Sequence, residues 1–136
     1  MSDMILKSTS KADPHKKLLL VVEDDEQYRK MFCELFEKEG FQVEIAVNGT
    51  MALEIADRNV PQLVILDILM PIMDGYEFIK EFKENEKLKD VPIVVLSNLS
   101  SEESIQKAKD LGVADYIVKS NIAVNEVVEL VKKHLK

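Results

Sequence analysis

The stretch LVILDILMPIMDG, residues 63–75, decides the fold of this chain. Its first four residues are apolar without a break, which is typical of a strand that is buried on both faces of a parallel sheet. The strand ends at Asp67, and Asp74-Gly75 can form a turn and cap a helix a few residues later. The stretch therefore predicts a strand, a loop and a helix, with one acidic residue where the strand ends.

Four other segments show the same pattern of an apolar strand followed by an amphipathic helix. Strands are predicted at residues 17–22, 41–47, 91–96 and 115–118. Strands that are apolar throughout and alternate with helices form parallel sheets with both faces covered, joined by right-handed crossovers. We therefore predict an α/β fold, a doubly wound sandwich of five strand-helix units.

The predicted helices carry start and stop signals. Asp25 and Asn48 stand where a side chain can cap the first and second helices, and Gly40 stands where the first helix should end. Ser100 and Glu103 have the spacing of a capping box that would open the fourth helix. The last helix should present an apolar face made of Val124, Val127, Val128, Val131 and Leu135.

Length and composition fit one domain. The chain has 136 residues, of which 46% are hydrophobic, and this is enough to build a core without disulfides. Residues 1–15 are polar and are expected to form a flexible arm, and residues 16–136 are expected to form the domain. Cys33 is the single cysteine, so no disulfide can form within the chain, and its place on the apolar side of a helix predicts a buried thiol.

The composition also argues against several classes of function. The apolar runs are far shorter than the roughly 20 residues that a membrane-spanning helix needs, so no membrane association is expected. The first residues do not resemble a secretory signal, so the cytoplasm is the expected location. A formal net charge of −7 argues against direct binding of nucleic acid, which requires clustered cations.

Polar residues stand at the carboxyl ends of the predicted strands, where ligands bind in folds of this type. They are Glu23, Asp24 and Asp25 after the first strand, Asp67 after the third, Ser97 after the fourth and Lys119 after the fifth. Carboxylates that converge on one rim would repel one another by roughly 4 kcal/mol per close pair at an effective dielectric constant near 20. A cation should relieve this repulsion, and hard oxygen ligands without histidine or cysteine favour Mg²⁺ or Mn²⁺.

These residue types suit phosphoryl chemistry. A carboxylate can attack phosphorus to form an acyl phosphate, and Asp67 is the natural candidate because a buried strand would hold it rigidly. Lys119 could neutralise charge on the transferred group, and Ser97 could donate a hydrogen bond to one of its oxygens.

Four motifs together make the chain resemble a known family. They are VED at residues 22–24, LDILMPIMDG at 66–75, LS at 96–97 and YIVK at 116–119, each at a strand end. In this order they resemble the response-regulator receiver family, over about residues 16–136. The resemblance implies a flavodoxin-like sheet with the strand order 2-1-3-4-5.

The resemblance also implies a role for each matching position. Asp67 would be the phosphoacceptor, Asp24 a direct metal ligand, Glu23 a ligand through water, Leu69 a backbone carbonyl ligand, Lys119 the family's lysine, and Ser97 and Tyr116 the two switch residues. The metal would be Mg²⁺, with Mn²⁺ as a substitute. On phosphorylation Ser97 would be drawn toward the phosphoryl group, and Tyr116 would turn inward.

Partners follow from the same resemblance. A sensor histidine kinase or a phosphotransfer protein would donate the phosphoryl group, and the receiver would assist its own phosphorylation and dephosphorylation without being an enzyme for a separate substrate. The sequence shows no output domain after Lys136, so the expected effector is another protein unless the sequence is part of a longer chain.

The chain departs from the family pattern at two places. Ser120 stands after Lys119, where the family usually has a proline in a cis bond, so either a trans bond with a reshaped loop or a strained cis bond is expected. Asn98 and Leu99 follow the switch serine, and Leu69 with Leu99 could form an apolar lid that keeps water from the acyl phosphate.

Other interpretations remain open at this point. The rival function is a pseudo-receiver, a protein-binding module that works without phosphorylation, and the missing proline is the feature that favours it. A hydrolase of the haloacid type would need an aspartate at the position of Leu69. Asp25 is more readily explained as a helix cap than as a metal ligand, Ser97 could simply end a strand, and Tyr116 could be an ordinary core aromatic.

Overall fold

A five-stranded parallel sheet forms the centre of the molecule. The computed structural model describes residues 15–70 and 72–135, so the arm expected at residues 1–15 lies almost wholly outside the described residues, as do Pro71 and Lys136. The strands are β1 (Leu18–Val22), β2 (Gln42–Ala46), β3 (Leu63–Leu66), β4 (Ile93–Ser97) and β5 (Asp115–Val118). Their order in the sheet is β2-β1-β3-β4-β5, which confirms the predicted topology.

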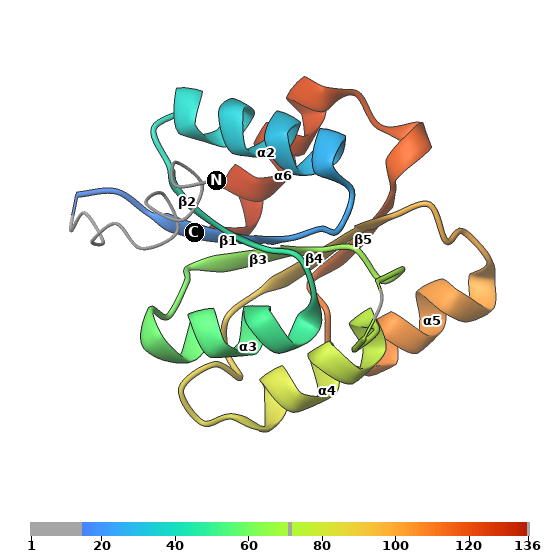
Figure 1. The fold of residues 1–136 in the computed structure, drawn as a ribbon. Coiled ribbons are helices and arrows are strands. Elements are labelled where there is room, and N and C mark those ends of the chain that lie inside the picture. Colours follow the sequence, from blue (N-terminus) through green and yellow to red (C-terminus); the bar gives the residue numbers. More distant parts are fainter. Residues whose placement is uncertain (1–14, 71, 136) are drawn as a thin grey trace.

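Helices cover both faces of this sheet. They are α2 (Glu26–Lys38), α3 (Gly49–Arg58), α4 (Gly75–Glu84), α5 (Glu102–Asp110) and α6 (Val124–His134), with a short 3-10 turn, η1 (Lys119–Asn121), after β5. Figure 1 shows α2 and α6 on one face and α3, α4 and α5 on the other. Each face has its own buried cluster, one around Phe32 and Phe36 and the other around Phe78 and Phe82. Among the described residues, no helix is both long and apolar enough to cross a bilayer.

The strand register places the residues of the expected site side by side. Val22, the last residue of β1, pairs with Ala46 of β2 and with Leu66 of β3. The ladder continues one step further, because the Asp67 amide donates a hydrogen bond to the Val22 carbonyl over 3.0 Å. Glu23 and Asp67 therefore leave neighbouring strands at the same level.

Helix caps agree with the sequence at three of four positions. Asp25 accepts hydrogen bonds from the amides of the next helix, Asn48 caps α3, and Asp74 closes a capping box with Glu77 at the start of α4. The prediction that Ser100 caps the fourth helix was wrong. Ser101 is the cap, and its hydroxyl accepts a hydrogen bond from the Ser104 amide over 3.1 Å, because the chain enters the helix one residue later than predicted.

The structure corrects one prediction about the C-terminal part of the chain and decides between two alternatives for another. Val124, the first residue of α6, is 42% exposed and so does not belong to the buried face of this helix. All peptide bonds between described residues are trans, so the Lys119–Ser120 bond takes the first of the two expected forms, with η1 as the reshaped loop. The Ser120 amide, which a proline would lack, donates a hydrogen bond to Asn98 Oδ1 over 3.2 Å. The two departures from the family pattern therefore contact each other.

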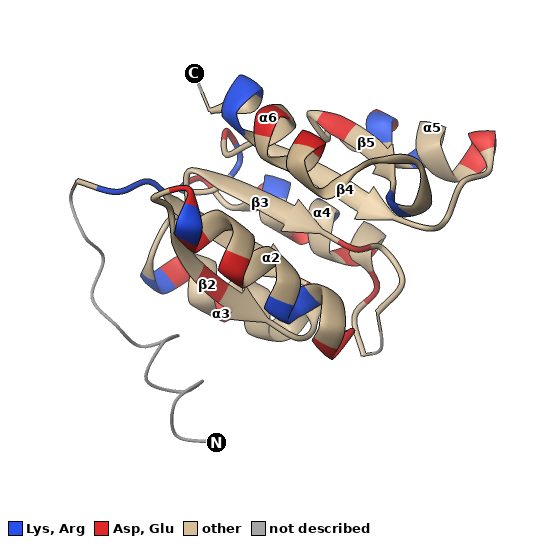
Figure 2. Cartoon of the chain, turned by 90° about the horizontal axis from the view of Figure 1, so that it is seen from above, with Lys and Arg blue, Asp and Glu red and all other residues tan. Residues whose placement is uncertain are grey.

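Charged residues surround this core. Figure 2 shows acidic and basic residues interspersed along the helices. The single cysteine, Cys33, is buried as predicted.

Candidate functional site

Three carboxylates meet at the carboxyl ends of β1 and β3. Oxygens of Glu23, Asp24 and Asp67 all lie within 4.8 Å of one another. Glu23 and Asp67 are buried, with 2% and 7% of their surface exposed, whereas Asp24 is exposed. The structure thus brings together the acidic residues that the sequence predicted at this rim, and it leaves Asp25 in the cap of α2.

Lys119 enters this acidic cluster from the end of β5. Its Nζ lies 2.7 Å from Glu23 Oε1 and 2.9 Å from Asp67 Oδ2, and the side chains of all three residues are buried. Burial of the amine works against its charge, but the hydrogen bonds to Glu23 and Asp67 outweigh this effect and raise the pKa of Lys119. The lysine is therefore a fixed positive charge beside Asp67.

Glu23 is the carboxylate most strongly affected by its surroundings. Burial raises the pKa of Glu23 from 4.5 to about 7, and the nearby Asp67 carboxylate adds to this shift, against the opposing effect of Lys119. A buried carboxylate next to another is costly in its charged form, and one lysine does not fully compensate it. The site thus retains unbalanced negative charge.

This unbalanced charge fits a divalent metal ion. Three carboxylates face one ammonium group, and all the candidate ligand atoms are hard oxygens, which is the donor set that Mg²⁺ and Mn²⁺ prefer. The exposed Asp24 leaves the cluster open to solvent on one side, so that a bound ion could keep waters and accept a substrate oxygen.

Each oxygen of the Asp67 carboxylate has a different partner. Oδ1 accepts a hydrogen bond from the Leu69 amide over 3.0 Å, while Oδ2 faces Lys119. The backbone bond restricts the rotation of the carboxylate, and Leu69 itself is 53% exposed. The role of the Leu69 carbonyl as a metal ligand stays a prediction.

The two predicted switch residues share one neighbour. Ser97 is fully buried, and its Oγ accepts a hydrogen bond from the Leu99 amide over 3.2 Å. The Tyr116 hydroxyl donates to the Leu99 carbonyl. The Tyr116 ring is already buried, with 8% exposed, so the expected inward turn on phosphorylation has no outward starting position here.

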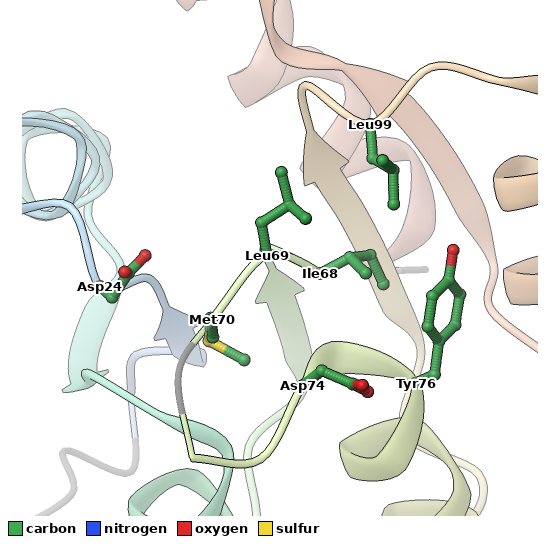
Figure 3. A pocket seen from close by; sticks show the side chains of 7 residues that line it. All are labelled: Asp24, Ile68, Leu69, Met70, Asp74, Tyr76 and Leu99. Atoms are coloured by element: carbon green, nitrogen blue, oxygen red, sulfur yellow. The ribbon is translucent and has the colours of Figure 1, made fainter.

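An open pocket of about 410 Å³ lies beside the carboxylates. Figure 3 shows Asp24 at one end and Tyr76 and Leu99 at the other, with Leu69 between them. A phosphoryl group approaching Asp67 from this side would pass the two leucines.

Sequence reasoning missed two residues of α2 that support the site. Arg29 is buried, and its Nη1 donates to the carbonyl of Asp24 over 3.0 Å and to that of Glu23 over 3.4 Å. Arg29 lies near the N-terminal end of α2, where a positive charge opposes the helix dipole. This unfavourable position was the signal in the sequence that Arg29 has a partner nearby. Tyr28 lies with its ring over Lys119, and no spacing rule in the sequence indicated that contact.

Comparisons with known proteins agree with this geometry. The model of the response regulator receiver domain matches residues 19–132. The chain is 33% identical over 117 residues to the sporulation initiation phosphotransferase F of Bacillus subtilis, a match that covers 86% of this chain and 92% of that protein. The chemotaxis protein CheY4 of Vibrio cholerae has a TM-score of 0.83 at 28% identity, over 88% of this chain and 99% of that one.

A second similar structure contains a metal. The Mn²⁺-bound form of the response regulator Rcp1 has a TM-score of 0.73 at 26% identity, over 86% of this chain and 90% of that one. The fold, the acidic cluster and the family match point in the same direction. This chain belongs to the response regulator receiver domains, the switch modules of two-component signalling.

Proposed function

We propose that Asp67 accepts a phosphoryl group from a histidine kinase or a phosphotransfer protein, and that this modification switches the domain between two signalling states. The observation that carries the proposal is the environment of the Asp67 carboxylate. It ends the central strand β3, it is oriented by the Leu69 amide, and it lies beside a lysine and two further carboxylates.

The transfer needs a nucleophile and a way to hold the charge of the incoming group. An oxygen of Asp67 forms a bond to phosphorus while the bond from phosphorus to the donor breaks, and the electron pair leaves with the donor. The product is an acyl phosphate with roughly two negative charges. A Mg²⁺ or Mn²⁺ ion held by Asp24, Asp67, the Leu69 carbonyl and, through water, Glu23 would supply positive charge against the phosphoryl oxygens.

The remaining residues act on the same oxygens. Lys119 already contacts the carboxylate that would be modified. Its amine can therefore exchange its hydrogen bond to Asp67 for one to a phosphoryl oxygen with little movement. The Ser97 hydroxyl can donate a hydrogen bond to another phosphoryl oxygen. To do so, Ser97 would move its Oγ away from the Leu99 amide. This would disturb Leu99, whose carbonyl accepts a hydrogen bond from Tyr116.

The disturbance reaches one surface of the molecule. Leu99 precedes α5, and Tyr116 belongs to the edge strand β5. The change would therefore appear on the surface at this edge of the sheet, which is formed by α5, β5 and α6. A downstream protein that binds this face in only one of the two states would read the switch.

Intact-protein mass spectrometry tests the proposal. The protein is incubated with acetyl phosphate with and without Mg²⁺, as wild type, as Asp67→Asn and as the matched control Asp90→Asn. Asp90 is an exposed aspartate that precedes β4, whereas the site lies at the carboxyl ends of the strands. We expect one metal-dependent phosphoryl adduct on the wild type and on Asp90→Asn, and none on Asp67→Asn. Its absence from folded wild type with several donors would overturn the proposal and favour the pseudo-receiver.

A further inference from the structure

The amine of Lys119 has a third neighbour besides its two carboxylates. An ammonium group has three N–H donors, and those of Lys119 face Glu23, Asp67 and the ring of Tyr28. Nζ lies 3.9 Å from the centre of that ring, which is close contact for a cation over an aromatic face. The ring therefore occupies the side of the amine that the carboxylates leave free.

The packing of α2 holds the Tyr28 ring in this position. The ring stacks on Phe32, one helical turn further on, with 5.9 Å between the ring centres and 26° between the ring planes. Phe32 is almost fully buried. Tyr28 also lines a cavity of about 250 Å³ together with Lys119, Ile122 and Val127, so it closes one wall of the space around the lysine stem.

We propose that Tyr28 is a positioning residue, which keeps the Lys119 amine directed at Asp67 during phosphoryl transfer. This inference rests on the proposed function. A third carboxylate in the place of Tyr28 would add to the repulsion in the site, and a hydroxyl would fix one N–H in one direction. An aromatic face attracts the cation over a broad area, so the amine can pivot from the carboxylate to a phosphoryl oxygen without gaining a water.

The alternative is that Tyr28 merely fills the space beside the cavity. Three variants separate the two explanations. Tyr28→Phe keeps the ring and loses only the hydroxyl, and Tyr28→Leu keeps an apolar side chain and loses the ring. Val127→Ala is the matched control, because it removes packing from the same cavity without touching the amine.

The first measurement does not depend on phosphorylation. A proton above an aromatic face is shielded, so the side-chain signals of Lys119 should be shifted upfield in the NMR spectrum of the metal-free wild type. We expect the shift to persist in Tyr28→Phe and in Val127→Ala and to disappear in Tyr28→Leu. Unshifted Lys119 signals in the wild type would overturn the inference.

The second measurement is the rate of phosphorylation by acetyl phosphate with Mg²⁺, on variants shown by urea unfolding to be folded. Loss of a desolvated cation–π contact should slow Tyr28→Leu by about 3- to 30-fold. Tyr28→Phe and Val127→Ala should stay within about 2-fold of the wild type, although Val127→Ala is the less stable of the two.

The outcomes distinguish this inference from the proposed function. If the wild type is phosphorylated and Tyr28→Leu is equally fast, the positioning role is overturned and the proposed function stands. If Tyr28→Phe is as slow as Tyr28→Leu, the hydroxyl and not the ring is responsible, which also overturns it. If the wild type takes up no phosphoryl group, the proposed function fails and the positioning role fails with it.

Discussion

The Tyr116 hydroxyl donates a hydrogen bond to the backbone carbonyl of Leu99, the same residue whose amide donates to Ser97. We predict that Tyr116→Phe lowers the free energy of unfolding by about 1 kcal/mol, because the carbonyl loses its partner. Urea unfolding measures this loss, and hydrogen exchange should become faster at the start of α5. Tyr28→Phe, which leaves Leu99 untouched, is the control. Unchanged exchange at the start of α5 in Tyr116→Phe would show that this bond does not hold the segment.

Restoring the family's proline should harm this chain. The Ser120 amide donates to Asn98 Oδ1, so Ser120→Pro removes the donor and leaves the Asn98 side chain without that partner. We expect a loss of about 1 kcal/mol, measured by urea unfolding. In the background of Asn98→Ala the same change should cost less, because the bond is already gone. An equal loss in both backgrounds would mean that the bond contributes nothing.

The first residue of α4 has no room for a side chain. A Cβ on Gly75 would lie 2.6 Å from the Cα of Ile68, the residue after the proposed phosphoacceptor. Gly75→Ala should therefore destabilise the protein by about 1–3 kcal/mol and slow its phosphorylation, since the backbone beside Asp67 must shift.

Gly49→Ala is a matched control for this prediction, because Gly49 also follows the cap of a helix. Its Cβ would meet the flexible side chain of Met73 at 2.9 Å instead of a backbone atom. A smaller loss of stability is expected, measured by thermal unfolding. If both variants lose the same amount, the contact with Ile68 is not what restricts this position.

Stability should depend on pH through Glu23. Its pKa rises from 4.5 to about 7 on folding, so the folded state holds the proton more tightly, and the contribution of Glu23 to stability falls as pH rises through that window. In EDTA, the free energy of unfolding of Glu23→Gln should therefore increase relative to that of the wild type as the pH rises from about 5 to about 8. Added Mg²⁺ should stabilise the wild type more than Glu23→Gln at the higher pH, because only the wild type keeps all of the expected metal ligands. A constant difference across this pH range in EDTA would contradict the shifted pKa.

The two leucines beside the pocket allow a test of the acyl phosphate's lifetime. Leu69 is half-exposed and lines the pocket together with Leu99, so an apolar lid has its parts in place. Leu69→Asn should shorten the half-life of the phosphorylated protein, because a polar side chain can hold the attacking water. The decay of the phosphoryl adduct by mass spectrometry gives the half-life. An unchanged or longer half-life would remove the lid from the explanation.

The sequence predicted the parts of the fold that depend on pattern. Five apolar strands and five amphipathic helices were all recognisable, because burial on both faces of a sheet leaves runs such as residues 63–66. Asp67, Lys119 and Glu23 were recognisable as candidate site residues because each follows a strand, and parallel strands all end at one edge. The strand order itself came from the resemblance to a family.

What the sequence could not predict depends on single contacts in three dimensions. Ser100 and Ser101 have equal chemistry, and only the path of the chain into α5 selected Ser101 as the cap. The bond between Asn98 and Ser120 joins residues of two loops that share no periodicity. The position of the Tyr28 ring over Lys119 likewise depends on how α2 packs on the sheet.

The attachment of α5 has a consequence for how such a protein can change over time. Every residue of α5 is described, and of these Ala108 alone is buried. Tyr76 of α4 contacts this helix twice: its hydroxyl donates a hydrogen bond to the Ser104 carbonyl over 3.1 Å, and its ring lies 4.1 Å from the Lys107 amine. A helix attached in this way can acquire a new surface, and with it a new binding partner, by substitutions that leave the hydrophobic core and the chemistry at Asp67 unaltered.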